Sequence, residues 1–277
     1  QEGYTKGYGA DGDHLKTAAE VRMALDIGMT MITLDCSEHI DNVAASQDLA
    51  ALNEKYAGFS QQERERWEKQ YADKTIALEG CSFTISGQDV VRMGCVYGKA
   101  IRHTLDIYHS LIVKCGRPID FEMSIDETLT STTPASHYFV ASELIAAGVQ
   151  ITSLAPRFCG DFQKGIDYIG DLAQFTSEFS VHVAIANHFG YKISVHSGSD
   201  KFKVFPIVGD KTGGYYHLKT AGTNWLEAVR VIAAYKPDLY RRMHAFALQH
   251  LDEAKKYYHI GARSENIPAL EKLGDAD

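Results

Sequence analysis

The chain has 277 residues, of which 45% are hydrophobic, enough to build the core of one large α/β domain. Its formal net charge is −8 and no basic stripe is present, which argues against a nucleic-acid or anionic-membrane partner. No apolar run approaches the roughly 18 residues of a membrane span, no signal peptide is visible, and the five cysteines show no C-x-x-C spacing. We therefore expect a soluble, cytoplasmic protein with reduced thiols.

Strand-like and helical patterns alternate along the chain. Period-2 alternation predicts strands at about residues 7–14, 29–35, 119–126, 150–155, 191–196 and 215–219. Helical periodicity predicts helices over residues 18–27, 43–55, 88–115, 136–147, 171–189, 225–235 and 237–259. The charged stretch 61–70 is of mixed sign and typical of a solvated helix face. Residues 81–87 are expected to form an inserted loop or a lid.

The alternation of strands and helices indicates parallel βαβ units. Neither a G-x-G-x-x-G motif nor a P-loop is present, so a (β/α)8 TIM-type barrel is favoured over a nucleotide-binding sheet. We expect residues 1–277 to form a single barrel catalytic domain. Because the chain opens at Gln1 and enters a strand-like run at once, we also expect it to be incomplete at its amino end.

Two short strand-like runs each deliver a histidine. In ISVHSGSDKF, residues 193–202, His196 follows the alternation of Ile193 and Val195, and in YYHLKTAGTNW, residues 215–225, His217 lies between two apolar residues. Period-2 geometry puts both imidazoles on the polar face of their strands. Small polar loops follow both runs, and the carboxyl ends of parallel strands are where ligands bind.

Other predicted strands also end in ionisable groups. The same alternation leaves Glu122 and Asp126 on the face opposite Phe121, Met123 and Ile125. The complete set that we expect at one mouth of the barrel is Asp13, His14, Asp35, Glu122, Asp126, Arg157, His196, His217 and Lys219.

Neutral imidazoles together with one carboxylate form a ligand set suited to Zn²⁺ or a similar divalent ion. We interpret His196 and His217 as metal ligands, whereas a single histidine at a strand end is more often a hydrogen-bonded structural residue. Glu122 and Asp126 either join the metal or pair with arginine and lysine inside the barrel. The SGSD loop from Ser197 is either a helix N-cap or a seat for an oxyanion.

Several long motifs carry a resemblance to a known family. The run from SIDET to DYIGD, residues 124–171, together with ISVHSGSDKF and HLKTAGTNWLEAVR, resembles the tagaturonate epimerase family over nearly the whole chain. The resemblance implies a metal-dependent isomerase that interconverts tagaturonate and fructuronate at carbon 4, some members also acting on fructose and tagatose. The implied partner is therefore a small ketohexose or keto-hexuronate, and a homo-oligomer is compatible with it. Members are longer at the amino end.

A more distant similarity concerns the order of the motifs. DGDHLK, GMTMITLDCSEH, VHSGSD and HLKTAGT are similar in order to segments of class II aldolases, which are zinc barrels. This similarity implies that His14 binds metal, that Asp13 handles protons, and that the six visible strands are barrel strands three to eight. The second zinc histidine of the aldolases has no counterpart in SLAPRF, and His217 would replace it.

These resemblances imply a set of roles. The metal, most simply Zn²⁺ with Mn, Ni or Co as alternatives, would lie on His14, His196 and His217. Catalytic carboxylates would be Asp13, Glu122 and Asp126, with Asp13 or Glu122 as the proton shuttle. Substrate-binding residues would be Arg157, Ser197, Ser199 and Lys219, and no organic cofactor is expected because no dinucleotide fingerprint is present.

Three functions remain open from the sequence. The first is a carbon-4 epimerase that uses retro-aldol and aldol steps, and the second is an aldolase-like sugar lyase that releases its fragments. The third is a catalytically silent barrel used for binding, which the presence of both ligand and proton-transfer residues disfavours.

Overall fold

The computed structural model describes residues 3, 5, 9–163, 165–220, 225–256, 260–268 and 270–274. By its internal contacts the chain divides into two compact units. The first comprises Gln1–Cys159, Asp171–Val195 and Ile207–His217. The second comprises Gly160–Gly170, His196–Pro206 and Leu218–Asp277.

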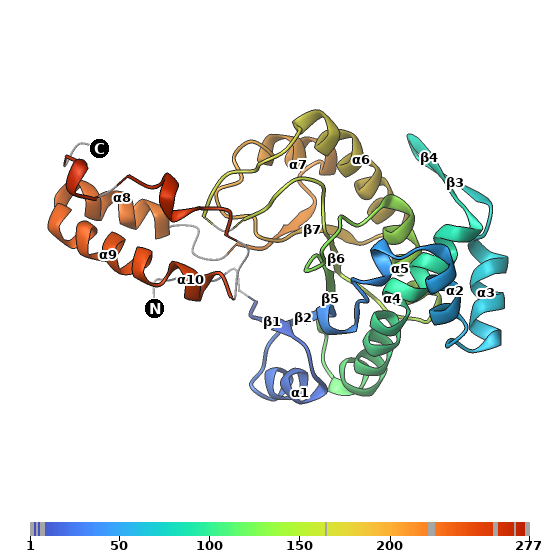
Figure 1. Cartoon of the computed structure of the whole chain (residues 1–277). Helices are drawn as coiled ribbons and strands as arrows, with labels where there is room; N and C mark the ends of the chain where they lie inside the picture. The colour runs from blue at the N-terminus through green and yellow to red at the C-terminus, as the bar shows by residue number, and fades with distance from the viewer. Residues whose placement is uncertain are drawn as a thin grey trace. The chain divides into compact units, whose positions relative to one another are not determined.

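A six-stranded sheet in the order β1-β2-β5-β6-β7-β8 organises the fold (Figure 1). Its neighbours from β1 to β7 pair in parallel. The strands are β1 Asp11–Leu15, β2 Met31–Asp35, β5 Asp120–Ile125, β6 Ser153–Pro156, β7 Lys192–Val195 and β8 Tyr216–Leu218. All six predicted strands are thus confirmed, although residues 7 and 8 of the first prediction lie outside the described residues.

The expected (β/α)8 TIM-type barrel, lacking its first strands in this chain, is wrong: the described residues form an open six-stranded sheet and a separate two-stranded sheet. Among the described residues the parallel sheet has six strands, begins at β1 and ends at β8, and is therefore open. Closing a barrel whose interior side chains can fill takes about eight strands with matched tilt and stagger. The period-2 pattern identifies strands one at a time and carries no information about closure. The α/β class is confirmed.

Several helices begin directly after a residue whose side chain caps them. Thr17 caps α1 Ala18–Asp26, Thr133 caps α5 Pro134–Ala146, and Asp171 caps α6 Leu172–Phe189, each side chain accepting a backbone N–H of the first turn. Gly190 ends α6 in the left-handed conformation, at φ 79°, as its lack of a Cβ allows.

Three predicted helices differ from the structure. The prediction over residues 43–55 splits into a 3₁₀ turn, Ala44–Ser46, and α2 Leu49–Tyr56, because Asp48 starts a new helix as its cap. The prediction over 88–115 covers α4 Gly87–Ile107, a π-helical turn Tyr108–Ile112 and a 3₁₀ turn Val113–Cys115. The prediction over 237–259 becomes α9 Pro237–Gln249 and α10 Leu251–Ala254, and residues 257–259 lie outside the described ones.

Residues 81–87 do not form a loop. Strand β4 Cys81–Ile85 pairs antiparallel with β3 Lys74–Leu78 in a two-stranded sheet that projects from the layer of helices around it (Figure 1). Helix α7 Phe205–Thr212 was also missed. Helix α3 Gln61–Tyr71 agrees with the mixed-charge helix face expected there, and α8 Trp225–Tyr235 lies where it was predicted.

Both faces of strand β5 are buried, but by different means. Phe121, Met123 and Ile125 are fully inaccessible, and the Phe121 ring lies 5.2 Å from that of Tyr108, centroid to centroid. Glu122 lies between Phe121 and Met123 and is equally inaccessible, although its side chain ends in a carboxyl group. Burial of such a residue requires hydrogen-bonding partners, which neighbouring strands supply.

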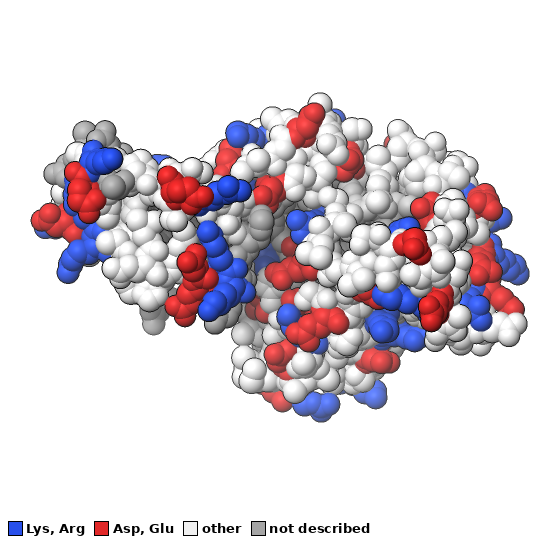
Figure 2. Space-filling view, viewed as in Figure 1, with Lys and Arg blue, Asp and Glu red and all other residues white. Residues whose placement is uncertain are grey.

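Surface charge follows no single sign. On the face shown in Figure 2, basic and acidic side chains are interspersed over both units. Among the described residues, none of the helices combines the length and the apolar character needed to span a bilayer.

Candidate metal and active site

A row of polar side chains crosses the parallel sheet. Strand register places Thr33 opposite Glu122 and Glu122 opposite Ser153, so their side chains leave the same face of the sheet. One residue from each strand joins the row: Asp11 of β1, Thr33 of β2, Glu122 of β5, Ser153 of β6, Ser194 of β7 and His217 of β8. The hydrogen bonds described next link them from strand to strand.

Glu122 lies at the centre of this row. The hydroxyl of Ser153 donates a short hydrogen bond to Glu122 Oε2, and Thr33 Oγ1 lies 3.4 Å from Glu122 Oε1. His217 Nδ1 lies 2.8 Å from Glu122 Oε2. Residues of three strands thus surround the two oxygens of one buried carboxylate, and the contacts of Ser153 and His217 hold its Oε2 in position.

His217 is half-buried, with 27% of its side chain exposed. Its Nδ1 is within hydrogen-bonding distance of Glu122 and, at 3.0 Å, of Ser194 Oγ. When Nδ1–H donates to the carboxylate, neutral imidazole keeps an unprotonated Nε2 that can bind a metal. Alternation predicted that His217 faces the polar side of its strand, and its contacts with Glu122 and Ser194 agree with that orientation.

The described residues contain a group whose chemistry fits a metal ion. Glu122, His196 and His217 each offer one ligand atom, and these atoms lie within 4.8 Å of one another. His196 follows directly on strand β7 and is 6% exposed. One carboxylate and two imidazoles are a donor set that suits Zn²⁺ and neighbouring transition metals. The group contains both histidines predicted as ligands, and it does not include His14.

His14 lies instead beside acidic residues at the ends of the first strands. Its Nδ1 is 3.5 Å from Asp35 Oδ2 and its Nε2 is 3.9 Å from Glu127 Oε1. Burial raises the pKa of the Asp35 carboxyl, but hydrogen bonds from His14 and Ser37 and the charge of Lys16 outweigh burial and hold that pKa well below its usual range. His14 itself adopts the left-handed conformation, at φ 54°, which is uncommon outside glycine.

Asp11 ends the polar row at strand β1. Thr33 Oγ1 donates to its Oδ2 at 2.9 Å, whereas Oδ1 is buried and has no hydrogen-bond partner among the described residues. Burial raises the pKa of Asp11; the Thr33 hydrogen bond lowers it, and the charges of Asp13 and Glu122 raise it further. A carboxyl in this setting favours its protonated form more than an exposed aspartate does.

The other predicted catalytic carboxylates occupy different environments. Asp13 is exposed on strand β1. Asp126 is half-buried just after β5 and accepts a hydrogen bond from the Ser124 hydroxyl.

The predicted substrate-binding residues lie in two places. The half-buried Arg157 follows β6, and its Nη1 donates to the Thr128 carbonyl while its backbone N–H donates to Thr132 Oγ1 at 3.0 Å. In the second unit, Ser197 and Ser199 belong to the loop that starts at His196, and the Lys219 carbonyl accepts from Gly198 N at 3.0 Å.

Four members of the polar row were missed from the sequence: Asp11, Thr33, Ser153 and Ser194. For Thr33 and Ser194 the signal was the same period-2 alternation that placed Glu122 and His217, since Thr33 follows Ile32 and Ser194 follows Ile193 within a strand, whereas Asp11 and Ser153 each begin their strands. The serine and threonine residues were not predicted as site residues because their side chains carry no charge.

The chain is similar to known epimerases over its whole length. The family model described as UxaE, tagaturonate epimerase, matches residues 1–277. The curated tagaturonate/fructuronate epimerase of Thermotoga maritima is 42% identical over 100% of this chain and 57% of its own length. Crystal structures of fructuronate-tagaturonate epimerase UxaE from Cohnella laeviribosi, native and complexed with glycerol, are 54% identical with a TM-score of 0.95, covering 99% of this chain and 56% of theirs. The chain thus spans little more than half the length of these relatives.

Proposed function

Because the chain belongs to the tagaturonate epimerase family, we propose that it forms part of an enzyme that interconverts tagaturonate and fructuronate by inverting carbon 4. The observation that carries the proposal is the match of the family over residues 1–277, joined to a site with buried, hydrogen-bonded ionisable groups. The neutral ketohexoses fructose and tagatose are further candidate substrates of the same chemistry.

The reaction restricts the mechanism. The hydrogen on carbon 4 is not α to the ketone at carbon 2, so its direct removal would leave an unstabilised carbanion. Carbon 4 does carry a hydroxyl β to that ketone. Removal of the hydroxyl proton allows the bond between carbons 3 and 4 to break, giving an enediolate and an aldehyde. Rotation of the aldehyde and renewed bond formation invert carbon 4.

The residues of the candidate metal group fit a divalent ion, with Glu122, His196 and His217 as its ligands. Such an ion supplies electrostatic stabilisation of the negative charge that develops on the oxygen at carbon 2. The hydroxyl of Ser153 holds the Glu122 carboxylate in place, as outer hydrogen bonds hold metal ligands in general. The ligand set of the proposal thus replaces His14 with Glu122.

The remaining roles fall to groups outside the ligand set. Asp13 is the proposed proton shuttle because it is an exposed carboxylate on the strand that also carries His14. Arg157 is proposed to seat the substrate carboxylate, since the Thr128 carbonyl takes only one of its five N–H donors. Lys219, Ser197 and Ser199 are proposed to bind further substrate oxygens, and Asp126 to assist proton transfer.

The test is an NMR assay of the enzyme on fructuronate and on tagaturonate. We expect each to be converted into the other with no loss of total six-carbon acid. Accumulation of three-carbon fragments would identify a lyase instead, since both enzymes share the first bond cleavage. Absence of conversion of either uronate would contradict the proposal.

Asp13→Asn serves as the variant in the same assay. Loss of the shuttle should lower kcat by about 100-fold or more, the usual contribution of a general acid-base group. Asp26→Asn is the matched control, because Asp26 is exposed at the end of α1. An unchanged rate in Asp13→Asn would exclude this residue as the shuttle.

A further inference from the structure

Lys201 is a lysine buried completely inside the second unit. Its side chain has 0% exposure, which is rare for lysine. The ammonium donates to three backbone carbonyls, those of Gln163 at 2.7 Å, Ile166 at 2.6 Å and Ser199 at 2.8 Å. An ammonium has three N–H donors, so these contacts use all of its capacity.

The three carbonyls belong to two separate stretches of the chain. Gln163 and Ile166 lie in the segment Gly160–Gly170, whereas Ser199 lies in the loop that follows strand β7. The side chain of Lys201 therefore ties the two stretches together at their backbones. The negative charges of Asp200, Asp167 and Asp161 favour the ammonium form, opposing the burial that lowers the pKa of Lys201.

The backbone of the loop after β7 is strained, so it depends on contacts that hold its conformation. Ser197 at φ 49° and Asp200 at φ 59° both adopt the left-handed conformation, although neither is glycine. Residues of this kind persist only where their surroundings hold them, and they cluster at functional sites. Lys201 is the residue next to Asp200, and its ammonium holds the carbonyl of Ser199 from inside the unit.

A second set of contacts holds the loop at Gly198. A Cβ placed there would lie 2.4 Å from Leu218 Cδ1 and 3.2 Å from the Lys219 carbonyl oxygen, so a larger residue would force the Leu218 side chain to move. The Gly198 amide donates to the Lys219 carbonyl at 3.0 Å. The Ser197–Ser199 backbone is thus fixed between the Lys219 segment and the ammonium of Lys201.

We propose that Lys201 is a positioning residue for substrate binding: its ammonium locks the Gly160–Gly170 segment to the loop after β7, so that Ser197 and Ser199 are presented to substrate oxygens in one fixed conformation. This inference rests on the proposed function for the part of those serines in substrate binding. Lys201 itself does not touch substrate, since carbonyls occupy its three N–H groups.

The test compares Lys201→Met with Lys203→Met. Methionine keeps an apolar stem of similar length but has no donor. Lys203 is exposed, and among the described residues its ammonium has one hydrogen bond, a long one of 3.4 Å to the Tyr168 carbonyl, while its backbone N–H, which the substitution keeps, donates to Asp167. In Lys201→Met we expect hydrogen exchange of the amides in residues 160–170 and 196–206 to quicken by about tenfold or more. We expect KM for the uronate to rise by about tenfold or more, with kcat reduced by less than about threefold, since binding rather than chemistry is disturbed. Lys203→Met should change neither.

Exchange and KM that both stay within about twofold of the parent in Lys201→Met would overturn the inference. A fall in kcat at unchanged KM would also overturn it. If Lys201→Met does not fold, reductive methylation of the parent enzyme replaces it as the test. We expect Lys203 to be methylated and Lys201 to be protected. Equal methylation of both lysines would contradict the proposal that Lys201 is bound to the three carbonyls. An enzyme that converts neither uronate would refute the proposed function, whereas the exchange and labelling results would still show whether Lys201 ties the two segments.

Discussion

Glu122 has two chemical roles that its geometry supports. Its Oε2 lies 2.8 Å from His217 Nδ1, the distance at which a carboxylate orients a metal-binding imidazole. It also belongs to the group of three whose ligand atoms lie within 4.8 Å of one another. We assign it as a ligand because a buried carboxylate gains most from a cation beside it.

Glu122→Gln separates the two roles. The amide oxygen can still accept from His217 Nδ1–H, but the negative charge is lost. We predict that the affinity for Zn²⁺ falls by about 100-fold, measured by metal titration and by metal content after dialysis. Glu127→Gln is the control, because Glu127 is 55% exposed and lies near His14. Metal binding equal to that of the parent would show that Glu122 only orients His217.

Two core histidines form a second polar cluster that the site does not use. His137 Nδ1 lies 2.9 Å from His182 Nδ1, and the Tyr191 hydroxyl is 2.6 Å from His137 Nε2. Both imidazoles are fully buried. Burial lowers the pKa of His182 to about 4, and burial with the neighbouring His182 lowers the pKa of His137 well below its ordinary value.

These histidines should make folding stability fall in acid. The folded protein keeps His182 neutral, while the unfolded chain binds a proton near pH 6.5, so the stabilisation is present above that pH and is lost as pH falls toward 4. We predict a loss of roughly 3 kcal/mol from His182 over this window. Urea unfolding at about pH 7, 5.5 and 4.5 measures it. His182→Gln should reduce the change of unfolding free energy with pH, whereas the control His109→Gln, at an exposed helical position, should leave it unchanged. An equal change with pH in the parent and in His182→Gln would contradict the role given to His182.

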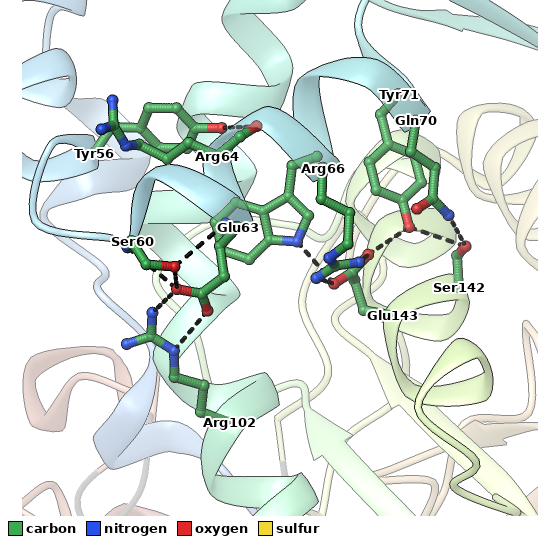
Figure 3. Close-up of polar contacts among 11 residues, drawn as sticks. Tyr56, Ser60, Glu63, Arg64, Arg66, Gln70, Tyr71, Arg102, Ser142 and Glu143 are labelled. Carbon is green, nitrogen blue, oxygen red and sulfur yellow. Dashed lines mark hydrogen bonds and ion pairs between the residues drawn. The ribbon is translucent and has the colours of Figure 1, made fainter.

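At the scale of elements, one buried carboxylate fastens helix α3 to helix α5. Glu143 of α5 is 4% exposed and accepts hydrogen bonds from Arg66, Trp67 and Tyr71 of α3 (Figure 3). Arg66 Nη1 lies 2.8 Å from Glu143 Oε1 and Trp67 Nε1 lies 2.7 Å from Oε2. If the carboxylate were removed, Arg66 and Trp67 would lose these hydrogen bonds, whereas the Tyr71 hydroxyl would keep its contact with Ser142 Oγ at 2.9 Å.

We predict that Glu143→Leu destabilises the fold by about 1–3 kcal/mol, because it removes the acceptor of the buried Trp67 N–H, whereas the half-exposed Arg66 can turn to water. Glu63→Gln is the comparison, since Glu63 pairs with Arg102 on the surface and glutamine can still complete the capping box with Ser60. That change should cost less than about 1 kcal/mol. Denaturant unfolding at neutral pH measures both, and similar losses in the two variants would refute the anchoring role of Glu143.

The elements themselves were predictable to different degrees. All six strands of the parallel sheet were predicted, most clearly β5 and β7, in which apolar residues alternate along one face. The β3–β4 hairpin did not, since exposed and half-buried residues occupy most of both strands. Its two-residue connection is Glu79 and Gly80, which lacks the Asn-Gly or Asp-Gly pair that marks most tight hairpins.

At the scale of the whole molecule, strand prediction did not extend to architecture. Whether six parallel strands remain an open sheet depends on their number, tilt and stagger, and none of these is written in the period of one strand. The candidate site was predictable where a charged or imidazole side chain stood out, as at Glu122, His196 and His217. Lys201 could not be found in this way, because lysines are almost always exposed and its partners are backbone carbonyls.

The proposed carbon-4 epimerisation depends on a divalent metal held by Glu122, His196 and His217. An NMR assay of uronate conversion tests this dependence, first on the enzyme after metal removal with a chelator and again after Zn²⁺, Mn²⁺, Ni²⁺ or Co²⁺ is restored. We predict that conversion falls by at least about 100-fold on removal and recovers with one or more of these ions. Full activity in the metal-free enzyme would contradict the metal dependence.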